Sequence, residues 1–203
     1  MFERLERFAP LTGVLFLVLF AGVFFSPETP GSDDPAAEMV KYWADHSAQQ
    51  RWIAAIASLA AVVLVWFGGS LRRAILRVEG GDGRLAALAF AGTVVIAIGI
   101  LIFSGFAFTA AETVNKVPAE VTQTITVLSN EFFLPLAAGL LLLFLASALA
   151  ILRHGVLPQW LGWVTLALVV LLLTPIGWLA FPGMALWAGL VGILLFIRGD
   201  TAQ

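Results

Sequence analysis

Long apolar runs separated by short polar segments form the main pattern along the chain. Six of these runs are about as long as the roughly 20 residues that cross a hydrocarbon core of about 30 Å. Their expected bounds are residues 8–25, 52–71, 85–108, 131–152, 160–179 and 184–197. A backbone in lipid must satisfy its own polar groups, so each run is expected to be a helix. The pattern predicts one all-α membrane domain over residues 1–203, a bundle of six transmembrane helices.

The connections add local detail to this prediction. In the longest one, Asp33, Asp34 and Pro35 are typical of a helix start, with an acidic cap and a proline in the first turn. Residues 35–50 are therefore predicted to form a short amphipathic helix in the first outer loop, continuous with the second span or bent against it. The sixth run is short, and we expect it to begin in a turn at residues 181–183 that closes a hairpin with the fifth.

Small residues and prolines predict how the spans pack. Gly92 and Gly99 in the third span indicate close helix contacts, as do the sixth span's small residues four apart: Ala185 with Gly189, and Ala188 with Gly192. A proline inside an apolar run frees a backbone carbonyl and bends a helix, so bends are expected within the fourth and fifth spans. These two prolines are Pro135 and Pro175.

The basic residues predict the orientation of the spans, because lysine and arginine concentrate on the cytoplasmic side. Eight of them fall on one side of the predicted bundle: Arg4, Arg7, Arg72, Arg73, Arg77, Arg84, Arg153 and Arg198. Three fall on the other: Lys41, Arg51 and Lys116. This bias places both termini in the cytoplasm. Tryptophans, which favour membrane boundaries, agree with it: Trp66, Trp160 and Trp163 lie at the inner ends, and Trp52, Trp178 and Trp187 at or near the outer ends.

Composition supports a membrane protein and excludes several function classes. The chain is 61% hydrophobic and 12% charged, with a mean hydropathy of +0.99, which is far from the values of soluble domains. A net charge of −2 gives no basic surface for nucleic acid. The chain has no cysteine, so disulfides, thiolate metal sites and thiol nucleophiles are excluded.

Three motifs carry a resemblance to a known family. They are Tyr42-Trp43-Ala44-Asp45-His46, Trp66-Phe67-Gly68-Gly69-Ser70-Leu71-Arg72, and the segment from Arg153-His154-Gly155 through Pro158-Gln159-Trp160 to Trp163. With these landmarks the chain resembles a family of uncharacterised small integral membrane proteins of actinobacteria, over almost its whole length. The resemblance implies a multi-pass protein of the bacterial plasma membrane. It implies no reaction, because that family has no assigned one.

Candidate chemistry is confined to a few polar residues near the outer boundary. Asp45 and His46 could move protons or bind a ligand, although a solvated helix face is the alternative explanation. No second histidine lies four residues from His46, and His154 is expected about a bilayer away. We therefore predict no metal site and no cofactor.

Glu131 stands at the outer boundary of the fourth predicted span, where a carboxylate near hydrocarbon is costly. It either faces the bundle and pairs with Arg51, Lys116 or His46, or it is the acidic residue in the first turn of a helix. In the first case Glu131, Arg51 and His46 would surround a polar opening beneath the helix at residues 35–50. An amphiphile could then place its head at these charges and its tail among Phe132 and Phe133.

Three function classes remain after these exclusions. A structural or accessory membrane protein, embedded among membrane lipids and assembled as a homo-oligomer or within a larger complex, best fits spans without charge. The alternative is binding or transport of a lipid or small amphiphile through an outer-leaflet cavity near Glu131. An intramembrane enzyme is disfavoured, because no recognisable pair of catalytic groups lies on one side, so we expect no catalytic residues.

Overall fold

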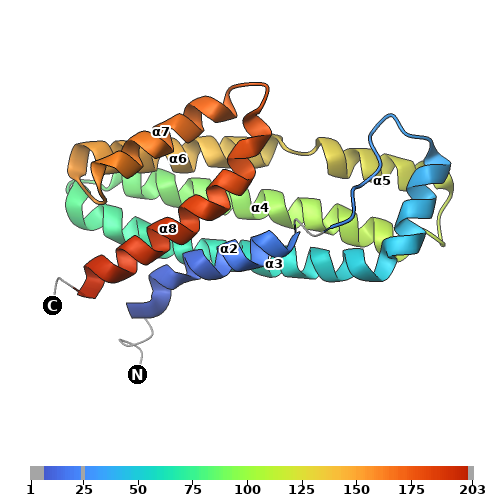
Figure 1. The fold of residues 1–203 in the computed structure, drawn as a ribbon, viewed down its shortest axis with the longest axis horizontal. Helices are drawn as coiled ribbons and strands as arrows, with labels where there is room; N and C mark the ends of the chain where they lie inside the picture. The colour runs from blue at the N-terminus through green and yellow to red at the C-terminus, as the bar shows by residue number, and fades with distance from the viewer. Residues whose placement is uncertain (1–6, 24–25, 201–203) are drawn as a thin grey trace.

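The computed structural model describes residues 7–23 and 26–200, and within these ranges all regular structure is helical. The helices pack side by side along one long axis (Figure 1). Four are long and apolar enough to cross a membrane by length and composition: Ala36–Glu79, Arg84–Thr113, Ala119–His154 and Gly177–Arg198. Two shorter apolar helices are Ala9–Val23 and Gln159–Leu172. Arg4, and the end of the first predicted span at residues 24–25, lie outside the described residues.

A helix lies over each of the six predicted runs, so the prediction of an all-helical fold is confirmed. In chain order the elements are η1 Ala9–Leu11, α2 Thr12–Val23, α3 Ala36–Glu79, α4 Arg84–Thr113, α5 Ala119–Glu131, α6 Leu134–His154, α7 Gln159–Leu172, η2 Gly177–Leu179 and α8 Ala180–Asp200. Helix α4 packs against both α3 and α6, and these three helices form the centre of the bundle. Helices α2 and α8 pack against each other, and α2 also packs against α3. Helix α7 packs against α6.

Helix α3 combines the predicted amphipathic helix and the predicted second span in a single element of 44 residues. Its first turns lie across one end of the bundle, and the helix then bends to run along it (Figure 1). The predicted acidic cap is wrong, because Pro35 occupies the N-cap position without a side-chain hydrogen bond. Asp34 instead closes the preceding turn, where its Oδ2 accepts a hydrogen bond of 2.7 Å from the Gly31 amide.

The two prolines expected to bend helices lie at helix ends instead. Pro135 is in the first turn of α6, where its missing N–H has no intrahelical partner to lose. Helix α7 ends at Leu172, before Pro175, so the chain turns at residues 173–176. The turn predicted at residues 181–183 is therefore wrong, because these residues belong to the first turn of α8.

Close helix packing at the predicted glycines is confirmed for α4 and α6. A Cβ added to Gly92 would lie 2.5 Å from the Leu143 amide nitrogen and 2.8 Å from the Gly139 carbonyl oxygen. At Gly99 an added Cβ would lie 2.8 Å from Cγ of Leu136. The backbones of the two helices therefore approach at a distance that only glycine permits.

Gly189 and Gly192 also lie at a helix contact, but with a different partner from the one expected. A Cβ added to Gly189 would lie 2.8 Å from Cδ2 of Leu17, and one added to Gly192 would lie 2.5 Å from the Pro10 carbonyl oxygen. The contact therefore joins α8 to η1 and α2, whereas the sequence pattern predicted a hairpin with the helix that precedes α8.

Candidate functional site

A break in the helical chain between α5 and α6 is the centre of the candidate site. Helix α5 ends at Glu131, and Phe132 leaves the helical conformation with φ −84° and ψ 51°. Helix α6 begins at Leu134, with Pro135 in its first turn. Glu131 therefore closes one helix and does not open the next, so its interpretation as a first-turn acid is wrong. At this end of a helix the macrodipole does not favour a carboxylate.

A cavity of about 260 Å³ lies beside the break, where α2, α3, α4 and α8 meet the α5–α6 junction. Five phenylalanines contribute to its wall: Phe20, Phe103, Phe132, Phe133 and Phe181. The polar residues of the lining are Ser129 and Asn130. The cavity exceeds the volume of about 150 Å³ that holds benzene, and it lies just below the range of about 300–1,000 Å³ that is usual for drug-sized ligands. Its size fits one apolar chain and not a two-chain lipid.

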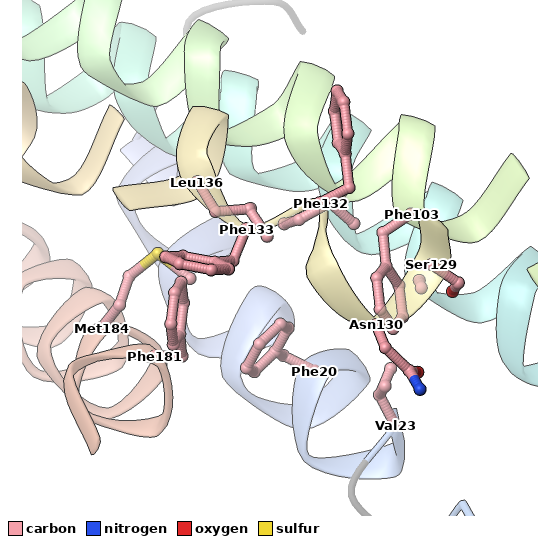
Figure 2. A pocket seen from close by; sticks show the side chains of 12 residues that line it. Phe20, Val23, Phe103, Ser129, Asn130, Phe132, Phe133, Leu136, Phe181 and Met184 are labelled. Atoms are coloured by element: carbon pink, nitrogen blue, oxygen red, sulfur yellow. The ribbon is translucent and has the colours of Figure 1, made fainter. Parts of the chain in front are cut away.

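Different types of residue line the two ends of this cavity. Figure 2 shows Ser129 and Asn130 at one end, beside Phe103, and Phe181 and Met184 at the other. The end at Ser129 and Asn130, called the polar end below, is contributed by the last turn of α5, although the surface of the cavity itself is almost wholly apolar. An amphiphile placed with its head at Ser129 and Asn130 would have its chain among the aromatic rings.

The loop between α2 and α3 lies against this polar end. Asn130 donates a hydrogen bond of 2.9 Å from Nδ2 to the Pro30 carbonyl oxygen. Ser32 donates a hydrogen bond of 2.7 Å from Oγ to Oε1 of Glu131. Glu131 is exposed, and it is the chain neighbour of Asn130 and Phe132, which both line the cavity. Glu131 is not itself among the lining residues, and these contacts place it beside the polar end, a position called the rim below.

A layer of buried hydrogen bonds holds the start of α3 to α5 and to the same loop. Trp43 Nε1 donates to Thr126 Oγ1 at 2.8 Å, and the Tyr42 hydroxyl donates to the Pro27 carbonyl at 3.0 Å. Gln50, which is buried, donates from Nε2 to Ser26 Oγ at 2.8 Å and also to the Tyr42 hydroxyl. These bonds fix the loop that borders the cavity.

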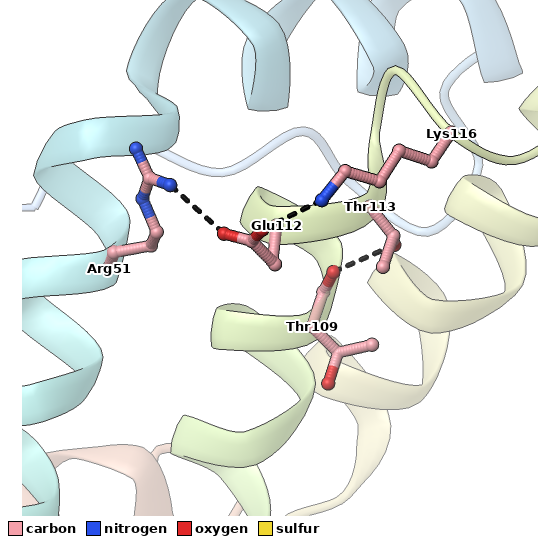
Figure 3. A network of polar contacts seen from close by, with 5 residues as sticks. All are labelled: Arg51, Thr109, Glu112, Thr113 and Lys116. Atoms are coloured by element: carbon pink, nitrogen blue, oxygen red, sulfur yellow. Dashed lines mark hydrogen bonds and ion pairs between the residues drawn. The ribbon is translucent and has the colours of Figure 1, made fainter.

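Arg51 and His46, the other predicted site residues, have partners away from Glu131. Arg51 forms an ion pair of 2.9 Å with Glu112, which also accepts a hydrogen bond of 2.7 Å from Lys116 (Figure 3). His46 Nδ1 lies 2.9 Å from the Tyr42 carbonyl oxygen. In the part of the chain that the structure describes, the expected pairing of Glu131 with Arg51 or His46 is not found. The reason is that α4 extends to Thr113, beyond the predicted end at residue 108, which places Glu112 beside Arg51.

The ion pairs of Glu112 are partly exposed, and pairs of this kind contribute little to stability.

Residues 7–23 and 26–200 contain no group of three or more His, Asp or Glu side chains that could hold a metal ion. The cavity is therefore the feature of this region with the geometry of a binding site.

Sequence reasoning identified Phe132 and Phe133 but missed the rest of the cavity wall. Phe20, Phe103 and Phe181 lie in uniformly apolar runs, where nothing in the pattern separates a cavity-facing position from a lipid-facing one. Asn130 carried a usable signal, because it is a polar residue next to Glu131 at the start of an apolar run.

Comparison of the chain with protein-family models, with curated proteins and with solved structures gives no match. A function for this chain must therefore be argued from the site itself.

Proposed function

We propose that the chain is a multi-pass protein of the bacterial plasma membrane, with six spans and both termini in the cytoplasm. The eight-to-three distribution of basic residues supports this orientation. The positions of exposed residues on α3 support the span limits: Trp52 is 74% exposed, and the exposed Arg72 follows 20 residues later. Twenty helical residues rise about 30 Å, which is the thickness of the hydrocarbon core.

The helix lengths support a position of the cavity near the outer boundary. Helix α3, with 44 residues, and α4, with 30, rise about 66 Å and about 45 Å, so both extend beyond a core of about 30 Å. The polar contacts of Trp43, Tyr42 and Gln50 then lie with α5 above the membrane. In this arrangement the α5–α6 junction marks the level of the outer leaflet, and the cavity is within reach of its lipids.

The function that the geometry supports best is binding of one apolar chain of a lipid or small amphiphile from the outer leaflet. The observation that carries this proposal is the cavity itself, with aromatic walls, a volume of about 260 Å³ and polar residues at one end. A purely structural or accessory role, in a homo-oligomer or in a larger complex, needs no such cavity. Binding is therefore favoured over the accessory role that was expected from the sequence.

A matched pair of substitutions on α2 tests this proposal. Val23 lines the cavity, whereas Val18 is 63% exposed on the same helix. Native mass spectrometry in a non-ionic detergent would measure the binding of a lysophosphatidylcholine with a 12-carbon chain. We expect one saturable site in the wild type, at least tenfold weaker binding in Val23→Trp, and unchanged binding in Val18→Trp. The smaller change Val23→Phe should give an intermediate affinity.

Equal affinities in the wild type, Val23→Trp and Val23→Phe would contradict the proposal. So would a wild-type protein whose adducts increase without saturation, because that behaviour indicates non-specific association with the detergent-solubilised surface. The thermal stability of each variant would be measured in the same detergent, so that a loss of binding can be separated from a loss of folding.

A further inference from the structure

The apolar wall of the cavity offers little selectivity among chains. A chain in the bilayer is already out of water, and lipid tails are as apolar as the side chains that would surround it in the protein. Transfer from bilayer to cavity therefore changes the hydrophobic free energy of the chain very little. Discrimination between amphiphiles must depend on the polar end, where Ser129 and Asn130 lie.

The two segments that border this end carry negative charge only. Residues 26–35 and residues 119–133 contain no lysine and no arginine. Their ionisable residues are carboxylates: Glu28, Asp33, Asp34, Glu120 and Glu131. Of these, Glu131 lies at the rim, and its hydrogen bond from Ser32 joins the two segments there.

The lysines and arginines on the same side of the bundle lie apart from the cavity lining. Arg51 and Lys116 both bind Glu112, at the contact between α3 and α4. Lys41 is exposed on the first turns of α3, the part of the helix that lies across the end of the bundle. None of the three is among the residues that line the cavity. The charges of the described residues at the rim are therefore acidic.

We infer that the cavity selects single-chain amphiphiles by the charge of the head group, accepting cationic and neutral heads and disfavouring anionic ones. This inference rests on the proposed binding function. Ser129 and Asn130 add no charge at this end, and Asn130 Nδ2 is bonded to the Pro30 carbonyl, so nothing there excludes hydroxyl or zwitterionic heads. The Glu131 carboxylate attracts a quaternary ammonium head and repels a phosphate or carboxylate head that is not neutralised by a positive charge.

Three lysophospholipids with the same 12-carbon chain test the inference. They are the cationic ethyl ester of lysophosphatidylcholine, the zwitterionic lysophosphatidylcholine and the anionic lysophosphatidylglycerol. Their dissociation constants would be measured by native mass spectrometry in the same non-ionic detergent. Equilibrium dialysis would measure the same constants at a low and at a high salt concentration. We expect the anionic lipid to bind at least about fivefold more weakly than the cationic one at low salt, and salt to narrow this difference.

Glu131→Gln should reduce the difference about fivefold, because a carboxylate roughly 8 Å from the head group in water attracts the cationic head and repels the anionic one by about 0.5 kcal/mol each. Glu120→Gln is the matched control, because Glu120 lies near the other end of α5, 11 residues and about 16 Å away along the helix. This variant should leave the difference unchanged.

The possible results separate this inference from the proposed function. Equal binding of all three lipids, at a site that Val23→Trp abolishes, would refute charge selection and leave the binding function intact. Tightest binding of the anionic lipid would also refute it. Absence of any site sensitive to Val23→Trp would refute the binding function. If Glu131→Gln does not fold, the wild type alone still tests charge selection, through the effect of salt on the difference in affinity between the anionic and the cationic lipid.

Discussion

Gly92→Ala tests the close packing of α4 against α6. The added Cβ would lie 2.5 Å from the Leu143 amide nitrogen, whereas ordinary contacts of this kind begin at 3.4 Å. The second close atom, the Gly139 carbonyl oxygen, also belongs to the backbone. No side-chain rotation can relieve such a contact, so the two helices must move apart by about 1 Å. Overpacking of this kind costs about 1–3 kcal/mol.

The matched control is Gly105→Ala on the same helix, because Gly105 is exposed and an added Cβ would meet nothing within 4 Å. Both substitutions gain about 0.8–1 kcal/mol of intrinsic helix propensity, so this gain cancels in a comparison of the two variants. The difference between them is then the packing penalty alone. At about 2–4 °C for each kcal/mol, it corresponds to roughly 2–12 °C in the unfolding midpoint.

The assay is thermal unfolding in one detergent, followed by circular dichroism at one scan rate, because unfolding in detergent is usually irreversible. We expect Gly105→Ala to melt at or slightly above the wild-type temperature and Gly92→Ala several degrees below its control. Equal midpoints for the two variants would show that α4 and α6 do not pack as closely as described.

Three further predictions concern topology, helix capping and the contact of α8. In intact cells Asn115→Cys should react with an impermeant thiol reagent and Arg77→Cys should not, and the chain has no native cysteine to interfere; the reverse pattern would overturn the orientation. Glu79→Ala should lower stability by about 0.5–2 kcal/mol in denaturant unfolding, because its carboxylate accepts two hydrogen bonds, of 2.6 and 2.9 Å, from backbone amides of the first turn of α4. Gly189→Leu should lower the midpoint by several degrees, because it forces α8 from α2, while Gly22→Leu, which meets open space, should change it little.

The helices themselves could be predicted from the sequence, because an apolar run in lipid has few alternatives to a helix. Their ends could not be predicted as well. Helix α4 passes through Ala110 and Ala111 to Thr113, and this polar and alanine-rich stretch does not differ from a loop in hydropathy. The partner of Arg51 depends on that extension, because only a helix reaching Glu112 brings the carboxylate beside the guanidinium group.

The break between α5 and α6 was also beyond the reach of sequence reasoning. The segment from Glu131 onward reads as one apolar run, and the non-helical conformation of Phe132 is supported by packing of its ring against Phe106. The cavity follows from this break and from the four other helices that converge on it. This convergence depends on packing between helices that are far apart in the sequence, and a hydropathy pattern does not indicate which helices pack together.

As one of the six proposed spans, α7 is short for the surrounding bilayer. Its 14 residues rise only about 21 Å, against the roughly 30 Å of a hydrocarbon core. The turn that follows is apolar and outward-facing, with Leu173 72% and Ile176 52% exposed. Its amides find partners locally, including Leu173 to the Val170 carbonyl and Gly177 to the Thr174 carbonyl. Lipids beside this turn would therefore have to compress or tilt, so the protein would deform one leaflet on one side only.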